Sequence, residues 1–204
     1  MINDNFQIIA YATDKSPYVH ELVELGDSCR KYGYKPFFKV VGDHGSWQRN
    51  TQAKAQFIML ASMMYAGFPI VYLDADARIA GRLDLLEHTD ADFAAHWFRD
   101  RELISACLYF KNDSLGWTDR IIHKWIDENE KYPDVWDQKN LQTVVKRLEP
   151  QGLNVLRLPP EYNWIDAGDP NRTPDLSERH YGRRQPRIIQ TQASRRYKKP
   201  GLVA

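Results

Sequence analysis

The stretch "PIVYLDADARI", residues 69–79, places two acidic side chains directly after a short apolar run. The run is β-branched and aromatic, which is typical of a buried strand. Residues two positions apart share one face of an extended chain, so Asp74 and Asp76 could bind one divalent cation together at the end of the strand. Aspartates also close strands through turns that bind no ligand. The rest of the chain must decide between a metal site and a turn.

Strands and helices alternate around this segment. The pattern predicts strands at 6–12, 36–41, 70–73, 91–98, 104–110, 153–158 and 186–190, and helices from Ser16 to Gly33 and at 49–65, 114–129 and 137–148. In the first helix we expect Ser16 as the N-cap and Pro17 as the first helical residue. This order predicts an α/β fold with a mainly parallel central sheet flanked by helices. Such sheets bind ligands beyond the carboxyl ends of their strands, which is where the two aspartates would lie.

Apolar residues three and four positions apart mark the side of each helix that should face the sheet. The expected inward residues are Val19, Leu22 and Val23 in the first helix, Ala53, Phe57, Leu60, Ala61 and Met64 in the second, Trp117, Ile121, Ile122, Trp125 and Ile126 in the third, and Leu141, Val144, Val145 and Leu148 in the fourth.

The composition is that of a chain with one substantial core. Its 204 residues are 43% hydrophobic, which is enough for a single domain that folds alone. Cys29 and Cys107 are the only cysteines, so neither a disulfide framework nor a cysteine zinc site is expected. The uncharged run 57–73 is broken by "AGFP", and no leader pattern is present at the N-terminus. We therefore expect a soluble cytoplasmic protein with no membrane association.

The formal net charge of +1 conceals an asymmetry. Residues 179–204 contain eight Lys or Arg and no Asp or Glu, whereas residues 1–178 hold 20 basic and 27 acidic residues. We therefore divide the chain into a main domain, 1–178, and a basic C-terminal segment, 179–204. The segment is either a solvated tail or a surface that contacts the phosphates of a nucleotide or nucleic acid.

Two common phosphate-binding loops are absent from the sequence. No two glycines stand one residue apart, which excludes the G-x-G-x-x-G loop, and there is no Walker A lysine loop. Two carboxylates cannot hold an anionic phosphate themselves, but a divalent cation between them and a diphosphate can. Asp74 and Asp76 therefore favour a nucleotide bound through a metal ion.

The sequence resembles the GT-A glycosyltransferases, and specifically the nucleotide-diphospho-sugar transferases. The resemblance covers most of the chain and is carried, in order, by "IIAYAT", "SWQRNTQAKAQFIM", "IVYLDADARI", "ACLYFKND", "DQKNLQTVV", "LPPEYNW" and "IIQTQASRRYKK". It implies a single GT-A (Rossmann-like) domain over 1–178, with 179–204 completing the donor site. It also implies a nucleotide-sugar donor, expected to be a UDP-sugar, and Mn²⁺ or Mg²⁺ as the cofactor.

The resemblance also assigns residues to the donor and the metal. It implies that Tyr11, Ala12 and Thr13 lie near the base, and that Asp74 and Asp76 bind the metal ion and the diphosphate.

Three further residues follow from the same resemblance. Asp137 and Gln138 match the family's acidic element near the sugar, and Gln190 stands where the family tends to place a histidine metal ligand. An amide oxygen binds a transition metal less well than imidazole does. Gln192 is the other candidate for the third ligand.

Transfer from a nucleotide sugar displaces a nucleoside diphosphate from an anomeric carbon. Cations near the leaving phosphate would stabilise its developing charge, and the candidates are Lys54, Arg195, Arg196 and Lys198. An inverting enzyme also needs a carboxylate base on the acceptor hydroxyl, for which Asp137 and Asp166 are candidates, whereas a retaining enzyme could use the leaving phosphate instead. Alternatively, the four cations are surface charges, Asp137 caps a helix, and Asp166 closes a turn.

The basic C-terminal segment is the part of the sequence that bears on the acceptor. Tyr181 and Tyr197 stand among the basic residues of the C-terminal segment, a mixture that suits a nucleic acid. We therefore expect either a nucleic acid with a hydroxyl on a modified, flipped-out base or a saccharide. His96 could approach the acceptor, and Trp97 could stack on a sugar, although core packing is the usual role of a tryptophan.

Two other classes of protein remain open. Haloacid-dehalogenase-like phosphotransferases also carry D-x-D after an apolar strand, but usually on the first strand and with Thr or Val two residues after the second Asp, where this chain has Arg78. A non-catalytic nucleic-acid-binding module would use the basic segment but would leave the ordered metal-site segments unexplained.

Overall fold

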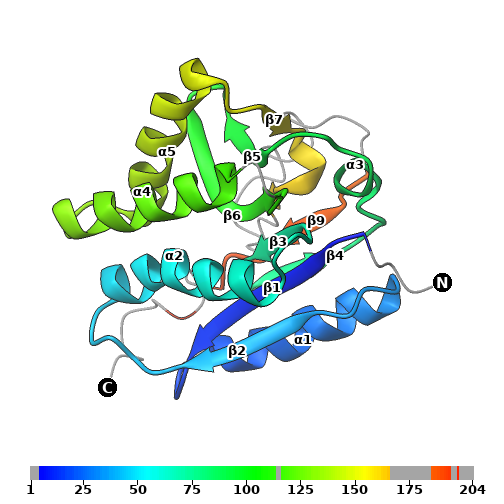
Figure 1. The fold of residues 1–204 in the computed structure, drawn as a ribbon. Helices are drawn as coiled ribbons and strands as arrows, with labels where there is room; N and C mark the ends of the chain where they lie inside the picture. Colours follow the sequence, from blue (N-terminus) through cyan, green and yellow to red (C-terminus); the bar gives the residue numbers. More distant parts are fainter. Residues whose placement is uncertain (1–4, 114–115, 166–184, 194–196, 198–204) are drawn as a thin grey trace.

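A six-stranded sheet forms the centre of the protein in the computed structural model, which describes residues 5–113, 116–165, 185–193 and 197 (Figure 1). Its order is β2-β1-β3-β6-β5-β7, and every strand is parallel to β1 except β6. The strands are β1 (Gln7–Thr13), β2 (Phe37–Val41), β3 (Ile70–Leu73), β5 (Phe93–Phe98), β6 (Glu102–Phe110) and β7 (Val155–Leu158). The predicted α/β fold with a mainly parallel sheet is confirmed.

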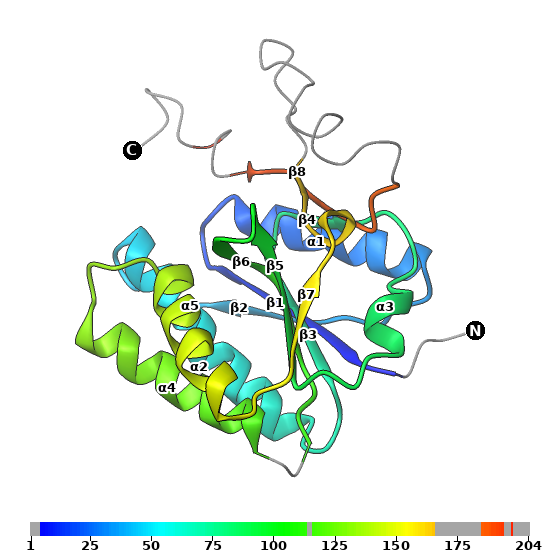
Figure 2. The same cartoon turned by 90° about the horizontal axis from the view of Figure 1, so that it is seen from above.

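Helices cover both faces of the sheet (Figure 2). They are α1 (Tyr18–Lys31), α2 (Trp47–Met64), α3 (Asp84–Glu87), α4 (Trp117–Lys131) and α5 (Asp137–Leu148), with 3-10 turns at η1 (Glu149–Gln151) and η2 (Pro160–Tyr162). One half of the core lies between the sheet and α2, α4 and α5, and includes Ile9, Ile58 and Trp125. The other half lies under α1 and α3, and includes Ile8 and Leu25. Ile8 and Ile9 point to opposite faces because side chains alternate along a strand.

A second, three-stranded sheet joins the end of the chain to the D-x-D segment. Its order is β4 (Ala77–Ile79), β9 (Ile188–Gln190) and β8 (Trp164–Ile165). Ala77 pairs with Gln190, and Ile165 pairs with Gln190 from the other side. The chain therefore brings Gln190 beside the residue that follows Asp76, although more than a hundred positions separate them.

The predicted helices are present, but several predicted details are wrong. Ser16 does not cap α1: Pro17 is the N-cap, and the Ser16 hydroxyl donates to the Thr13 carbonyl oxygen instead. Val23 is exposed on α1, and Leu60 and Met64 are exposed on α2. The buried side of α2 passes through Lys54 and Ser62, among other residues, so a prediction from apolar spacing alone rotates that helix.

The pairing of β5 with β6 is interrupted by a large bulge. Ala95 pairs with Leu108, but the next residue, His96, pairs with Ile104. Residues 105–107 of β6 therefore have no partner on β5. This part of β6 runs beside the end of β3, where Leu73 pairs with Cys107. Bulges of this kind redirect side chains and are frequent beside active sites.

Among the described residues, no helix is both long enough and apolar enough to cross a membrane.

Candidate active site

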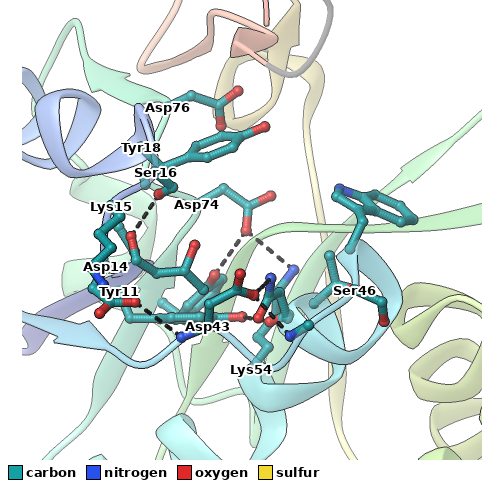
Figure 3. Close-up of a pocket in the computed structure, with 18 residues that line it drawn as sticks. Tyr11, Asp14, Lys15, Ser16, Tyr18, Asp43, Ser46, Lys54, Asp74 and Asp76 are labelled. Atoms are coloured by element: carbon teal, nitrogen blue, oxygen red, sulfur yellow. Dashed lines mark hydrogen bonds and ion pairs between the residues drawn. The ribbon is translucent and has the colours of Figure 1, made fainter. Parts of the chain in front are cut away.

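A pocket of about 770 Å³ opens where β1 and β3 end. It is lined by Tyr11, Ala12, Thr13, Asp14, Lys15, Ser16, Tyr18, Asp43, Gly45, Ser46, Trp47, Asn50, Thr51, Lys54, Tyr72, Asp74, Ala75 and Asp76 (Figure 3). It contains both D-x-D aspartates and the three residues predicted to lie near the base. Its volume lies within the range of roughly 300–1,000 Å³ for small-molecule sites.

A buried lysine in the floor of this pocket contacts two carboxylates, one that lines the pocket and one behind it. Lys54 Nζ lies 3.1 Å from Asp74 Oδ1 and 3.3 Å from Asp137 Oδ2. It also donates to the hydroxyl of Ser105 at 3.0 Å, and the Tyr72 hydroxyl donates to Asp74 Oδ1 at 2.9 Å. Figure 3 shows the Lys54 ammonium and the Asp74 carboxylate pointing toward one another. Lys54 thus links α2, β3, β6 and α5 at one point.

Burial and charge act in opposite directions on this group. Burial would lower the pKa of Lys54, but the charges of Asp137 and Asp74 outweigh it and raise the pKa. Burial also raises the pKa of Asp137, and Lys54 opposes that rise. Because the ion-pair distances are short, we take Lys54 as a charged ammonium shared by both carboxylates, which offsets one of their two negative charges.

Asp137 is the first residue of α5 rather than its N-cap, which is Trp136. The capping role considered from the sequence is therefore wrong, and the buried side chain faces Lys54. Gln138 lies one residue further along and accepts a hydrogen bond from the Ser105 backbone N–H at 3.1 Å. Its amide nitrogen donates to Glu102 Oε1 at 2.9 Å, so both ends of this side chain are occupied by β6.

Hydrogen bonds join Asp76 to the segment that follows β9. Its Oδ2 accepts a hydrogen bond from the Ala193 backbone N–H at 2.7 Å, and its carbonyl oxygen accepts from the Thr191 N–H at 3.1 Å. Burial and the nearby charge of Asp74 raise the pKa of Asp76 to about 6. The described residues therefore neutralise the Asp76 carboxylate only in part.

Gln190 carries a polar group that the described residues leave unsatisfied. Its side chain is buried, and neither Oε1 nor Nε2 has a hydrogen-bond partner among those residues. Such an orphaned amide costs free energy unless a ligand or water binds it. The described residues contain no group of three or more His, Cys, Asp or Glu placed to hold a metal ion. Asp74 and Asp76 line one pocket, and Gln190 pairs with the residue that follows Asp76; carboxylate and amide oxygens are ligand types that fit Mg²⁺ or Mn²⁺.

The opposite end of the pocket is built from loops after β1 and β2. Asp43 Oδ1 accepts hydrogen bonds from the Gly45 N–H and from the Asn50 side chain, and Asp14 Oδ1 accepts from the Asp43 N–H. The Tyr11 hydroxyl donates to the Asn50 carbonyl oxygen at 2.6 Å. These bonds fix the wall of the pocket beside the residues assigned to the base.

The structure brings most of the predicted site residues together. Asp137 and Gln138 lie just behind the pocket, against Lys54 and Ser105. Asp166, Arg195 and Arg196 lie outside the described residues.

Ser105 and Tyr72 were missed by the sequence analysis. Ser105 reaches Lys54 from the β6 bulge, which leaves no signal in a strand-like sequence. Tyr72 is indistinguishable from a core residue in an apolar run.

The sequence matches no protein-family model and no curated protein. The structure, however, is similar to a glycosyltransferase involved in the glycosylation of the major capsid of PBCV-1, with a TM-score of 0.68 and 13% identity over 94% of this chain and 95% of that one. It is also similar to the glycosyltransferase GlyE of Streptococcus pneumoniae TIGR4, with a TM-score of 0.63 and 16% identity over 92% of this chain and 54% of that one.

A third similar structure is the galactosyltransferase LgtC in complex with donor and acceptor sugar analogs, with a TM-score of 0.56 and 15% identity over 91% of this chain and 86% of that one. The protein therefore has the GT-A glycosyltransferase fold.

Proposed function

We propose that this protein is a metal-dependent glycosyltransferase that moves a sugar from a nucleotide-diphosphate sugar to an acceptor hydroxyl. The observation that carries the proposal is the pairing of Asp74 and Asp76 in one pocket at the carboxyl ends of β1 and β3, on a GT-A fold. A UDP-sugar is the expected donor. The fold favours this proposal over a haloacid-dehalogenase-like phosphotransferase and over a non-catalytic nucleic-acid-binding module, because neither of those accounts for it.

Asp74, Asp76 and Gln190 would hold the metal ion. Gln190 pairs with the residue after Asp76, and its buried amide has no hydrogen-bond partner among the described residues, which supports a role as a ligand. When bound, Mn²⁺ or Mg²⁺ would supply positive charge to the diphosphate leaving group. Gln192 remains the other candidate for the third protein ligand.

The described side chains would act on the donor from two directions. Tyr11, Ala12 and Thr13 would hold the base end of the nucleotide. Lys54 keeps the Asp74 and Asp137 carboxylates in place and would offset one of their two negative charges at the sugar end of the pocket. Asp137 is then a poor general base, because it is already ion-paired and buried, and it fits better as a group that positions the sugar.

A saccharide is the favoured acceptor. LgtC, a protein with the same fold, was solved with acceptor as well as donor sugar analogs. A nucleic-acid acceptor is the second candidate, because residues 179–204 hold eight basic and no acidic residues. Neutralising Arg183, Arg184 and Arg187 separates the two: a nucleic acid should then bind more weakly and with a shallower salt dependence.

Calorimetry tests the donor site directly. UDP and UDP-sugars should bind the full chain at least tenfold more tightly with Mn²⁺ than with EDTA, and Asp76→Asn should remove that difference. A panel that includes GDP- and ADP-sugars identifies the base. Equal binding of every nucleotide with and without metal would contradict the proposal.

A further inference from the structure

A second pocket, of about 350 Å³, opens at the ends of β5 and β7. It is lined by residues 96–100, from β5 and the turn after it, and by residues 157–160, from β7 and the segment after it. Its volume lies at the lower end of the range for small-molecule sites, so it suits a group no larger than a small ring or two. Nothing in the proposed donor site uses these residues.

The register of the sheet places this pocket beside the donor pocket. Leu73, at the end of β3, pairs with Cys107, which lies within the bulge between the partners of Ala95 and His96. Tyr72 and Ala95 both pair with Leu108, so His96 is level with Leu73, the residue before Asp74, and lies two strands away across β6. At about 4.8 Å per strand, the lateral separation is roughly 10 Å.

Two arginines in the pocket are held against aromatic rings. Arg157 Cζ lies 4.9 Å from the centre of the Trp97 ring, and Arg99 Cζ lies 5.0 Å from the centre of the Phe98 ring. Stacking uses the faces of a guanidinium and leaves its N–H edges for a ligand. Arg157 has only a loose, partly exposed ion pair with Glu149 at 3.6 Å. Within the described part of the chain, Arg99 has no ion-pair partner.

The same pocket also holds hydrogen-bond acceptors. His96 Nδ1 lies 2.8 Å from the Leu158 carbonyl oxygen, which can only accept, so Nδ1 carries the proton and Nε2 is left as an acceptor. Burial lowers the pKa of His96, which keeps the ring neutral. Asp100 adds a carboxylate. Acceptors of this kind bind sugar hydroxyls, whereas the arginines suit an anion.

The turn that carries Arg99 and Asp100 has a backbone conformation that is unfavourable for an arginine. Their φ angles are 51° and 56°, and the Arg101 N–H donates to the Phe98 carbonyl oxygen at 3.1 Å. A two-residue turn with positive φ at both central positions favours Asn-Gly. Arg99 at a positive φ lowers the local stability of the turn. Residues held in such conformations cluster at functional sites.

We propose that this pocket binds the acceptor at a saccharide residue that carries an acid group, either a carboxylate or a phosphate. Arg99 and Arg157 hold the acid, and Asp100 and His96 accept hydrogen bonds from the ring hydroxyls. The proposal rests on the proposed function, because it places the acceptor next to the donor pocket along one edge of the sheet.

Saturation-transfer NMR on the full chain, without donor or metal, tests the pocket by itself. The probes are methyl glucuronide, glucose 6-phosphate and the neutral methyl glucoside. At least one acidic probe should bind about tenfold more tightly than methyl glucoside, and the tighter of the two identifies the acid.

Arg99→Asn should weaken binding of that acidic probe at least tenfold. Asn suits a positive φ, so this variant should fold at least as well as the wild type. Arg120→Asn is the matched control, because Arg120 also lies over an aromatic ring, with Cζ 4.4 Å from the Trp117 ring centre, but is outside the pocket. It should leave binding unchanged.

Equal binding of all three sugars, binding of none, or undiminished binding by Arg99→Asn would overturn the proposal. Donor hydrolysis by the wild type is measured separately. Its absence would remove the proposed function and leave the NMR result standing, so the two failures are distinguishable.

Discussion

The ammonium of Lys54 and the carboxylate of Asp74 form an ion pair 3.1 Å apart in the floor of the proposed donor pocket. The pair joins the buried side of α2 to the end of β3, and Asp137 joins it from α5 at 3.3 Å. One side chain therefore connects the proposed metal site to three elements of the fold. Its removal should affect stability as well as activity.

Lys54→Met should lower the free energy of unfolding by about 3–5 kcal/mol, because it leaves the buried carboxylate of Asp137 without a cation. Adding Asp137→Asn should recover a large part of the loss, since one of those charges is then gone. Urea denaturation of Lys54→Met, Asp137→Asn and the double variant measures the coupling free energy between the two side chains. Lys31→Met, at an exposed lysine over Tyr32, is the control and should change stability by less than about 0.5 kcal/mol. A similarly small loss in Lys54→Met would show that the buried ion pairs contribute little.

His96 should make the fold less stable in acid. Burial lowers its pKa in the folded state, so below pH 6.5 the unfolded chain takes up a proton that the folded chain resists. The stability that neutral His96 contributes is present above pH 6.5 and is lost as the pH falls through the lowered pKa. His96→Asn keeps a donor for the Leu158 carbonyl oxygen but cannot titrate. Between pH 7 and pH 5 it should lose less stability than the wild type in urea denaturation; equal losses would contradict this assignment.

Gln190 should show opposite effects on stability and on metal binding. Gln190→Met replaces an unsatisfied buried amide with an apolar side chain of similar size, so stability without metal should rise by about 1–3 kcal/mol. Mn²⁺ affinity should fall, because an oxygen ligand is lost. Gln190→His should instead tighten Mn²⁺ binding, since imidazole suits a transition metal better. Unchanged Mn²⁺ affinity by calorimetry in both variants would remove Gln190 from the metal site.

The elements with strong periodicity were predictable from sequence. The helix at 137–148 was expected with Leu141, Val144, Val145 and Leu148 inward, and α5 has those bounds and buries all four. The exposure of Leu60 on α2 was not predictable. The buried side of α2 includes Lys54 instead. The burial of Lys54 depends on its ion pairs with Asp74 and Asp137, which lie elsewhere in the fold.

The pocket could be anticipated only in part. The aspartates after β3 follow from the strand pattern, because the carboxyl ends of parallel strands meet at one edge. Ser105, in contrast, reaches Lys54 because three residues of β6 bulge out of register, and register is set by pairing between distant strands. The reversed direction of β6 and the contact of Gln190 with β4 depend on tertiary pairing in the same way.

We propose that Asp74 and Asp76 make nucleotide-sugar chemistry depend on a metal ion. The most direct measurement is the slow release of UDP from a UDP-sugar, without acceptor, in the presence of Mn²⁺, by the wild type, Asp74→Asn and Asp76→Asn. We expect release by the wild type that stops with EDTA, and a loss of about 100-fold or more in each variant, with folding confirmed by circular dichroism. Undiminished release by either folded variant, or release that EDTA does not affect, would contradict the account.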